Sequence, residues 1–406
     1  MGKSDGSESH NLQKYGVPFY GAAWVPYSHV RSKLLSPEGI NKDDNDSDGG
    51  DRNGSKDEAS SAAACIYYVV LAGGGGEGRS GIPNAVVLSH FDFASNSLSD
   101  QPVAKLGTGS DLPYRMAVHP GGDGIILICY FLSLYRFFEW DEVKSAEVHK
   151  LGLKESEKVL SQLENVGQQL VLAFNSKGSI LATGGEDGNL RVFKWPSMEV
   201  ILNEAQAHAS VKDLSFSPDG KFLVSLGNRG HGRVWDVTSS TVVASLAKEK
   251  DEIFVSCRFS PINDQNPVLY IAAITDKGGS IITWNTTSWK RTRSKQVVQE
   301  PVSSFNISSD GELLAIGMAQ GDISIINSTS LKVQTMVKKA HLGIVTALAL
   351  SHDSRALVSA SMDSSARVTL IEDKKQSGGL NLWIIIFIIL LSIAAYFMND
   401  KGIILT

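Results

Sequence analysis

This chain of 406 residues contains few cysteines and has no excess of positive charge. Its three cysteines, Cys65, Cys129 and Cys257, are far apart and form no CxxC pair, which argues against a zinc site and a disulfide framework. We therefore expect three reduced, partly buried thiols. The formal net charge is −5, so neither the basic stripe of a nucleic-acid binder nor a nucleic-acid partner is expected.

Other common signals are missing as well. Residues 1–16 contain no apolar run, so a secretory signal is not expected. Gly6 stands where a myristoylation pattern needs Ser or Thr. The sequence shows no acid/base cluster and no paired metal ligands, so we expect neither covalent catalysis nor a small-molecule substrate.

One long apolar run is present near the C-terminus, at residues 382–398, with the sequence LWIIIFIILLSIAAYFM. It carries no charge, and Trp383 and Tyr396 lie near its ends, where aromatic rings favour the membrane interface. A spanning helix needs roughly 17–25 residues, so this run is at the short end of the range. We predict a single-pass transmembrane helix, with residues 1–377 in the cytosol and residues 399–406 as a short lumenal tail.

The shortness of the run suits the thinner bilayer of the endoplasmic reticulum, which we therefore expect to be the membrane concerned. Five asparagines stand in N-x-S/T sequons and would be glycosylation candidates only if the bulk of the chain were lumenal: Asn45, Asn53, Asn285, Asn306 and Asn327.

The body of the chain repeats one pattern, in which an apolar strand, a polar turn and further apolar strands follow one another. Equivalent apolar positions recur every 42 to 48 residues, at Phe174, Phe216, Phe259, Ile307 and Leu350. This spacing matches the period of about 40–45 residues that is typical of WD repeats.

Two weaker copies lie upstream, one starting near Tyr20 and resuming at Ile66, the other starting near Met116. The acidic, polar stretch 41–61 has too little apolar surface to order itself, and we predict a disordered insertion there. The predicted fold class is therefore all-β: a seven-bladed WD-repeat β-propeller over residues 1–377, followed by the transmembrane helix.

Two histidines, His208 and His341, each follow an alanine and precede a strand. This is the place of the histidine in a degenerate Gly-His signature of a WD repeat. Because no second metal ligand lies at a useful spacing, we expect a structural hydrogen bond inside a blade for each of them.

The strand that begins near Ile66 runs into a glycine-rich loop, residues 73–84, which reads GGGGEGRSGIPN. At face value it fits both a dinucleotide-binding fingerprint and a P-loop in which Arg79 replaces lysine. Both motifs need a helix to follow at once, but Pro83 and a second apolar stretch follow here. Two interpretations remain open: a flexible connector, or a loop ordered by an ion on its backbone carbonyls, as rings of carbonyls hold potassium.

The string GGGG-x-G-x-x-G-x-P-N resembles the ion-binding loop of a known family, the endoplasmic-reticulum exchange factors of the prolactin regulatory element-binding protein type. These proteins activate the small GTPase that starts COPII coat assembly, and the chain looks most like their plant members. The resemblance extends over the whole chain, through YGVPFYGA at residues 15–22, KKAH at residues 338–341 and the apolar run.

The resemblance implies a potassium ion that orders the loop, with carbonyls supplied by Gly73, Gly74, Gly75 and Gly76. It implies that Asn84 is the catalytic residue, contacting the GTPase and helping to open its nucleotide site. Ile82 and Pro83 would form the rest of the contacting tip.

The function implied is guanine nucleotide exchange at the endoplasmic-reticulum membrane, with a small COPII GTPase as partner and no covalent chemistry. The alternative is a non-catalytic propeller scaffold that helps a specific cargo, such as a phosphate transporter, to leave the endoplasmic reticulum. Retention of the full glycine loop and Asn84 favours the exchange factor. The departure from a minimal family member is the acidic insertion.

Overall fold

The computed structural model describes residues 10–35, 66–76, 80–130, 135–144, 149–158, 160–164, 166–261, 268–371 and 390. The chain divides into two compact units, Met1–Leu370 and Ile371–Thr406. The predicted insertion at 41–61 lies outside the described residues, and so does the predicted span at 382–398 except for Leu390. Within the described part of the chain, no helix is both long and apolar enough to cross a membrane.

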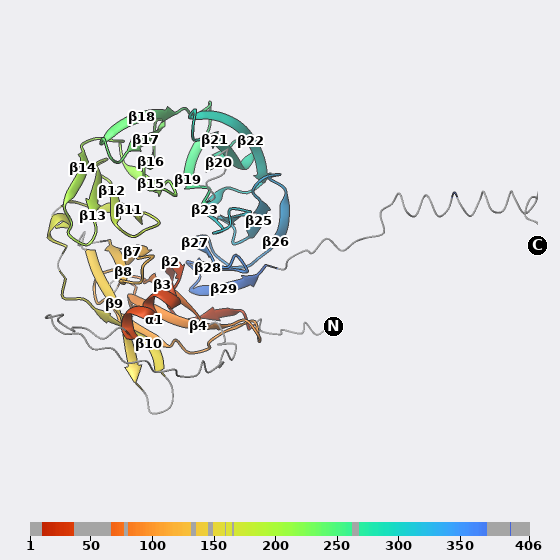
Figure 1. The fold of residues 1–406 in the computed structure, drawn as a ribbon. Coiled ribbons are helices and arrows are strands. Elements are labelled where there is room, and N and C mark those ends of the chain that lie inside the picture. The colour runs from red at the N-terminus through yellow and green to blue at the C-terminus, as the bar shows by residue number, and fades with distance from the viewer. Residues whose placement is uncertain are drawn as a thin grey trace, which may run out of the picture. The chain divides into compact units, whose positions relative to one another are not determined.

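Seven antiparallel sheets form the first unit, and Figure 1 shows them arranged in a ring with the first strand of each sheet innermost. This arrangement confirms the predicted seven-bladed propeller. Blade 1 consists of β2 (Phe19–Trp24), β3 (Tyr67–Gly73), β4 (Ala85–Asp92), β5 (Ser97–Leu98) and β6 (Ala104–Gly107). Blade 2 consists of β7 (Pro113–Val118), β8 (Ile125–Cys129), β9 (Tyr135–Lys144) and β10 (His149–Glu155). Blade 3 consists of β11 (Gln169–Phe174), β12 (Ile180–Gly185), β13 (Leu190–Lys194) and β14 (Val200–Glu204).

Blades 4 to 6 repeat the same meander of four strands. Blade 4 consists of β15 (Val211–Phe216), β16 (Phe222–Gly227), β17 (Gly232–Asp236) and β18 (Thr241–Leu246). Blade 5 consists of β19 (Ile253–Phe259), β20 (Val268–Thr275), β21 (Gly278–Asn285) and β22 (Lys290–Val298). Blade 6 consists of β23 (Val302–Ile307), β24 (Leu313–Met318), β25 (Ile323–Asn327) and β26 (Val333–Val337).

Blade 7 takes its outermost strand from the other end of the unit. It joins β27 (Val345–Leu350), β28 (Ala356–Ser361) and β29 (Ser365–Leu370) to β1 (Leu12–Lys14). Lys14 pairs with Ser365 and Leu12 with Arg367, in an antiparallel register. The repeat pattern did not predict this closure, because a strand of three residues has no detectable period.

The apolar core lies between neighbouring blades. One cluster, for example, combines Val224 and Leu226 of blade 4 with Phe254 and Leu269 of blade 5. Each sheet has two apolar faces, and radial packing covers both of them. Cys129 and Cys257 are free and buried in this core, and burial raises the pKa of Cys129 to about 12. The predicted thiol state of these two is confirmed; Cys65 lies outside the described residues.

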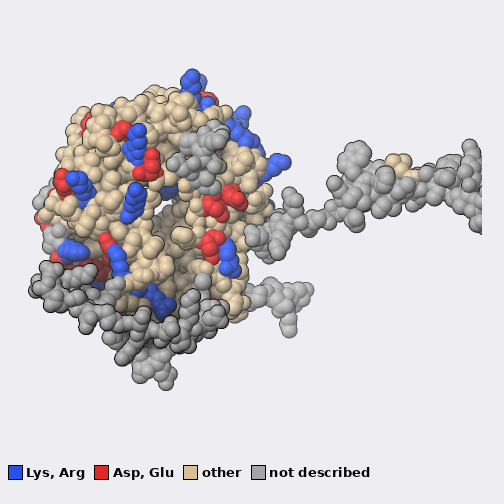
Figure 2. Space-filling model, in the orientation of Figure 1, with Lys and Arg blue, Asp and Glu red and all other residues tan. Residues whose placement is uncertain are grey.

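Every innermost strand carries a β-bulge at the same place, near the end where the strand begins. The register skips one residue in each blade: Tyr20, Tyr114, Leu170, Lys212, Val255, Ser303 and Thr346. Figure 2 shows a hollow at the centre of the ring, with basic and acidic side chains interspersed around it on the face toward the viewer.

Two short helices complete the described residues of the ring. Helix α1 (Tyr27–Leu35) follows β2, and its buried residue Val30 packs in the core cluster shared by blades 1 and 2. The 3-10 helix η1 (Ser161–Leu163) precedes β11. The repeat analysis predicted neither, because helices of this length add no recurring period.

Candidate functional site

The glycine loop connects the two central strands of blade 1. β3 ends at Gly73, which pairs with Phe19 of β2 on one side and with Ala85 of β4 on the other. The backbone N–H of Gly74 donates to Pro18 O at 2.9 Å. The predicted strand–loop–strand context is confirmed, since β4 begins where both nucleotide-binding motifs require a helix.

Close backbone approach explains why glycine is needed at the start of the loop. A Cβ on Gly74 would collide with Asn84 Oδ1, and a Cβ on Gly75 would lie 2.6 Å from Ile82 Cβ. Gly76 has φ +76°, a left-handed conformation that only glycine adopts without steric cost. The loop is therefore folded back tightly on the residues that end it.

Asn84 is the side chain on which the loop closes. Its Oδ1 accepts a hydrogen bond from the N–H of Gly76 at 3.1 Å, and its Nδ2 donates to Gly109 O at 2.9 Å. The residue is 1% exposed. In this structure its amide group points inward and joins two loops, so its predicted contact with a GTPase stays a prediction and would require both bonds to break.

Among the described residues of the loop, 73–76 and 80–84, the exposed ones are Ser80, Gly81 and Pro83. Ser80 Oγ donates to Gly75 O at 2.7 Å and accepts from the N–H of Ile82 at 3.2 Å. Ile82 is half-buried and Pro83 is exposed. Of the three predicted contact residues, these two therefore have surface that a partner could touch.

A second loop, residues 108–111 between β6 and β7, lies against the glycine loop. The N–H of Thr108 donates to Asn84 O at 3.0 Å, and Thr108 Oγ1 donates to Asp111 O at 2.6 Å. Thr108 is 2% exposed. The two loops are thus joined through both the backbone and the side chain of Asn84.

Arg136 on β9 of blade 2 holds this second loop in place. It donates to Thr108 O at 2.8 Å and lies 3.4 Å from Asp111 Oδ2. Its two remaining nitrogens bind Glu155 of β10 in a bidentate pair at 2.8 and 2.6 Å. Arg136 was missed at the sequence level, because nothing in the spacing connects it to Asn84.

The donor atoms of the loop suit the potassium ion that the family resemblance implies. Among the described residues, no group of three or more His, Cys, Asp or Glu side chains could hold a metal. What the loop offers instead is neutral oxygen, from the backbone carbonyls of Gly73, Gly74, Gly75 and Gly76. Hard, neutral oxygen ligands are those that potassium prefers, so these residues fit the ion.

The two singled-out histidines make the predicted structural hydrogen bonds. His208 Nε2 bonds Ser225 Oγ at 2.8 Å, and the same hydroxyl accepts from Trp235 Nε1 at 2.8 Å. His341 bonds Ser365 Oγ at 2.6 Å and Ser359 Oγ at 2.8 Å. Burial lowers the pKa of each histidine to about 4, so both are neutral in the fold at pH 7.

The fold and the loop together define a class, WD-repeat β-propellers with a glycine loop on the face where the innermost strands begin. Residues 172–262 match the family described as "Anaphase-promoting complex subunit 4 WD40 domain", and residues 332–369 match "WD domain, G-beta repeat". SEC12-like protein 2 of Arabidopsis thaliana is 55% identical over 93% of this chain and 92% of its own length. The chain belongs to the SEC12 family.

Other relatives are more distant. SEC12-like protein 1 of Arabidopsis thaliana is 29% identical over 79% of this chain and 80% of its own length. The mouse protein named guanine nucleotide-exchange factor SEC12 is 26% identical over 61% of this chain and 66% of its own length.

Solved structures support the fold alone, at low sequence identity. Sqt1 of Chaetomium thermophilum superposes with a TM-score of 0.64 at 14% identity, covering 91% of this chain and 99% of Sqt1. A chain from a structure titled "COPII on membranes, outer coat vertex" superposes with a TM-score of 0.65 at 13% identity, covering 91% of this chain and 87% of that one.

Proposed function

We propose that this chain is a guanine nucleotide exchange factor for the small GTPase that initiates COPII vesicle formation at the endoplasmic reticulum. Membership of the SEC12 family supports the proposal, because relatives in mouse and rat are named as guanine nucleotide-exchange factors. The single observation that carries it is the glycine loop, which is closed by Asn84 and tied to a second loop of the same face.

The mechanism is differential binding, not covalent chemistry. An exchange factor accelerates GDP release when it binds the nucleotide-free GTPase more tightly than the GDP-bound form. A rigid surface serves this purpose, because little entropy is lost when it docks. The exposed tip at Ile82 and Pro83 would make the contact, and Asn84 would keep that tip in shape until the partner engages it.

The backbone carbonyls of Gly73, Gly74, Gly75 and Gly76 would hold the potassium ion, which would supply a positive charge that offsets the repulsion between these carbonyls. The chain's own residues do the remaining work. Asn84 holds the N–H of Gly76 by a hydrogen bond, and Gly74 packs closely against Asn84, so the described residues at the two ends of the loop are fixed against each other. Residues 382–398, as the proposed single-pass anchor, would keep the propeller on the cytosolic face of the endoplasmic-reticulum membrane, where the GTPase is recruited.

The test is release of labelled GDP from the COPII GTPase, with the full chain in detergent micelles that keep its apolar run soluble. We expect faster release with the wild type in potassium than in sodium. Asn84→Ala removes two hydrogen bonds of about 1 kcal/mol each, so release should slow about thirtyfold. Asn203→Ala, at an exposed asparagine on β14, is the matched control and should behave as wild type.

No acceleration by a folded wild-type chain would contradict the proposal and favour a non-catalytic export scaffold. Equal acceleration in potassium and in sodium would support the exchange activity but contradict the proposed role of potassium. Acceleration that survives Asn84→Ala would show that the loop does not depend on its closing side chain.

A further inference from the structure

A polar cavity of about 260 Å³ lies on the axis of the ring. Residues from the innermost strands of all seven blades line it, including the bulged residues Tyr20, Lys212 and Thr346. Those strands begin at the face that carries the glycine loop, since Phe19 at the start of β2 pairs with Gly73. The cavity shares none of its lining residues with the glycine loop.

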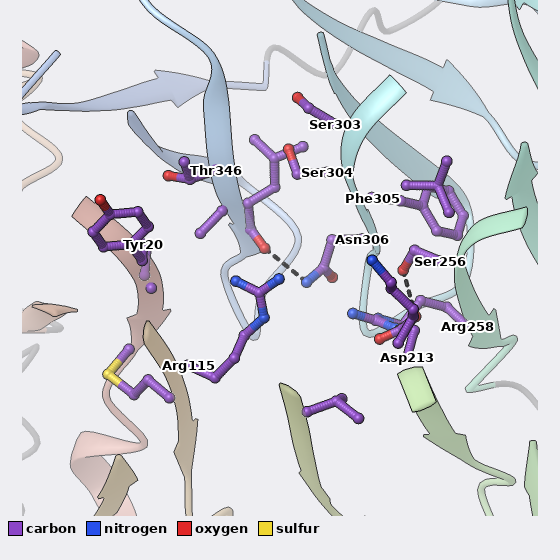
Figure 3. A pocket seen from close by; sticks show the side chains of 18 of the residues that line it. Tyr20, Arg115, Asp213, Ser256, Arg258, Ser303, Ser304, Phe305, Asn306 and Thr346 are labelled. Atoms are coloured by element: carbon purple, nitrogen blue, oxygen red, sulfur yellow. Dashed lines mark hydrogen bonds and ion pairs between the residues drawn. The ribbon is translucent and has the colours of Figure 1, made fainter. Parts of the chain in front are cut away.

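Three basic side chains and a single carboxylate line this cavity: Arg115, Lys212, Arg258 and Asp213. The charge of this carboxylate is paired with Arg258. Asp213 Oδ2 lies 2.8 Å from Arg258 Nη1 and accepts from Ser256 Oγ at 2.6 Å and from the N–H of Cys257 at 2.7 Å. Figure 3 shows these groups gathered at one wall of the cavity.

Two positive charges remain without an acidic partner in the cavity. In the described part of the chain, Arg115 is held by its neighbour Tyr114, whose carbonyl accepts a hydrogen bond at 3.2 Å and whose ring centroid lies 4.3 Å from the guanidinium carbon. Figure 3 shows Arg115 reaching across the cavity toward Asn306. Lys212 is exposed and forms no ion pair among the described residues, since the neighbouring Asp213 is paired with Arg258. This excess is notable in a chain whose formal net charge is −5.

Five of the seven bulged residues also line the cavity: Tyr20, Lys212, Val255, Ser303 and Thr346. A bulge leaves its extra residue outside the ladder, so its N–H and C=O are not paired across the sheet. Here one such residue from each of the seven innermost strands stands at one end of the ring. A concave site that is lined by unpaired cations focuses the electrostatic field on a small anion.

We propose that the cavity binds a compact phosphate-bearing anion, held by Arg115 and Lys212. Arginine and lysine are the side chains that recognise phosphate oxygens best, one by a planar fork and the other as a point charge. The cavity is smaller than the roughly 300–1,000 Å³ of drug-sized sites, so a soluble phosphate ester fits it better than a folded peptide. A phospholipid headgroup shares the chemistry, and the test separates the two sources.

The experiment is calorimetric titration of the full chain in detergent micelles with pyrophosphate, and in parallel with a phosphoinositide dissolved in the same micelles. We expect one pyrophosphate per chain, with an affinity that falls as salt is raised. Arg115→Gln and Lys212→Ala should each weaken binding about tenfold, because each removes a hydrogen bond to a charged group. Thermal unfolding without ligand verifies that each variant is folded.

The matched controls are Lys290→Ala and Lys332→Ala, which remove exposed lysines of blades 5 and 6 away from the cavity. Both should bind pyrophosphate as the wild type does. Pyrophosphate that does not bind, or that binds folded Arg115 and Lys212 variants equally well, would overturn the proposal. Binding of the phosphoinositide alone would overturn the soluble anion in favour of a lipid headgroup.

Discussion

Gly74 and Asn84 occupy adjoining space that has no room for one more carbon atom. A Cβ on Gly74 would meet the Asn84 amide oxygen, which cannot retreat because Gly76 N–H binds it and Gly109 O holds the other end of the amide. At the residue scale, the loop is therefore specified by steric exclusion as much as by hydrogen bonding.

Gly74→Ala tests this exclusion. The added methyl group should force Asn84 out of its place and slow GDP release about as much as Asn84→Ala does, with the propeller still folded. Gly107→Ala is the control from the same blade, because a Cβ there meets nothing within 4 Å. An alanine at position 74 that leaves the release rate unchanged would show that the loop shape is not what the reaction needs.

The two buried histidines make the stability of the propeller depend on pH. Burial holds the pKa of His208 and His341 at about 4, whereas an unfolded histidine titrates near 6.5. Between these values the unfolded chain binds more protons, so stability is full above pH 6.5 and is lost as the pH falls toward 4. Each histidine should account for about 3 kcal/mol over that window.

Denaturant unfolding of the first unit at a series of pH values measures the effect. His341→Asn should lower stability at pH 7 and flatten the slope between pH 6.5 and 4. A slope unchanged by removing either histidine would contradict their role, and would point to acidic groups as the source of acid sensitivity.

At the scale of elements, the glycine loop depends on a strand of the next blade. Arg136 of β9 bonds the carbonyl of Thr108, whose N–H bonds Asn84 O. Glu155 and Asp111 fix the guanidinium from two sides. Blade 2 thereby limits how far the two loops of blade 1 can move.

Arg136→Lys keeps the charge but cannot span Thr108 O and both oxygens of Glu155. We expect GDP release to slow about tenfold, corresponding to one lost charge-assisted hydrogen bond, and to need more potassium for its half-maximal rate. Arg191→Lys is the matched control, since Arg191 sits on the third strand of blade 3 and pairs with Asp187 at 2.8 Å. Equal effects of the two substitutions would mean a general loss of stability and no link to the loop.

The blades could be predicted from the sequence because an apolar position recurs in successive repeats, as at Phe216 and Phe259. The sequence also located the glycine loop and its strands, because six glycines in twelve residues are visible without a structure. The hydrogen bond between Arg136 and Thr108 could not be predicted from the sequence, because residues of different blades come together only in the folded ring. The inward direction of Asn84 was out of reach for the same reason: its partner Gly109 belongs to another loop.

At the scale of the whole molecule, the predicted span at 382–398 should decide where the propeller works. Deleting residues 378–406 should move the protein from the membrane fraction to the soluble fraction, with exchange toward a soluble GTPase retained. The described sequons at Asn285, Asn306 and Asn327 should carry no glycan, because the ring is expected in the cytosol. A shift in electrophoretic mobility on glycosidase treatment would show that the ring is lumenal and would contradict the predicted topology.

The pairing of β1 with β29 sets a delay in the life of the nascent chain. Lys14 can pair with Ser365 only after about 350 more residues have been synthesised. At about 5–20 residues per second, the ribosome needs roughly 20–70 s for this step. Throughout that time the early blades stand as an open row with one interblade surface uncovered, which is the condition under which chaperones are recruited. The time that the ribosome takes to synthesise the segment from Lys14 to Ser365 is therefore the shortest time for which the ring stays open.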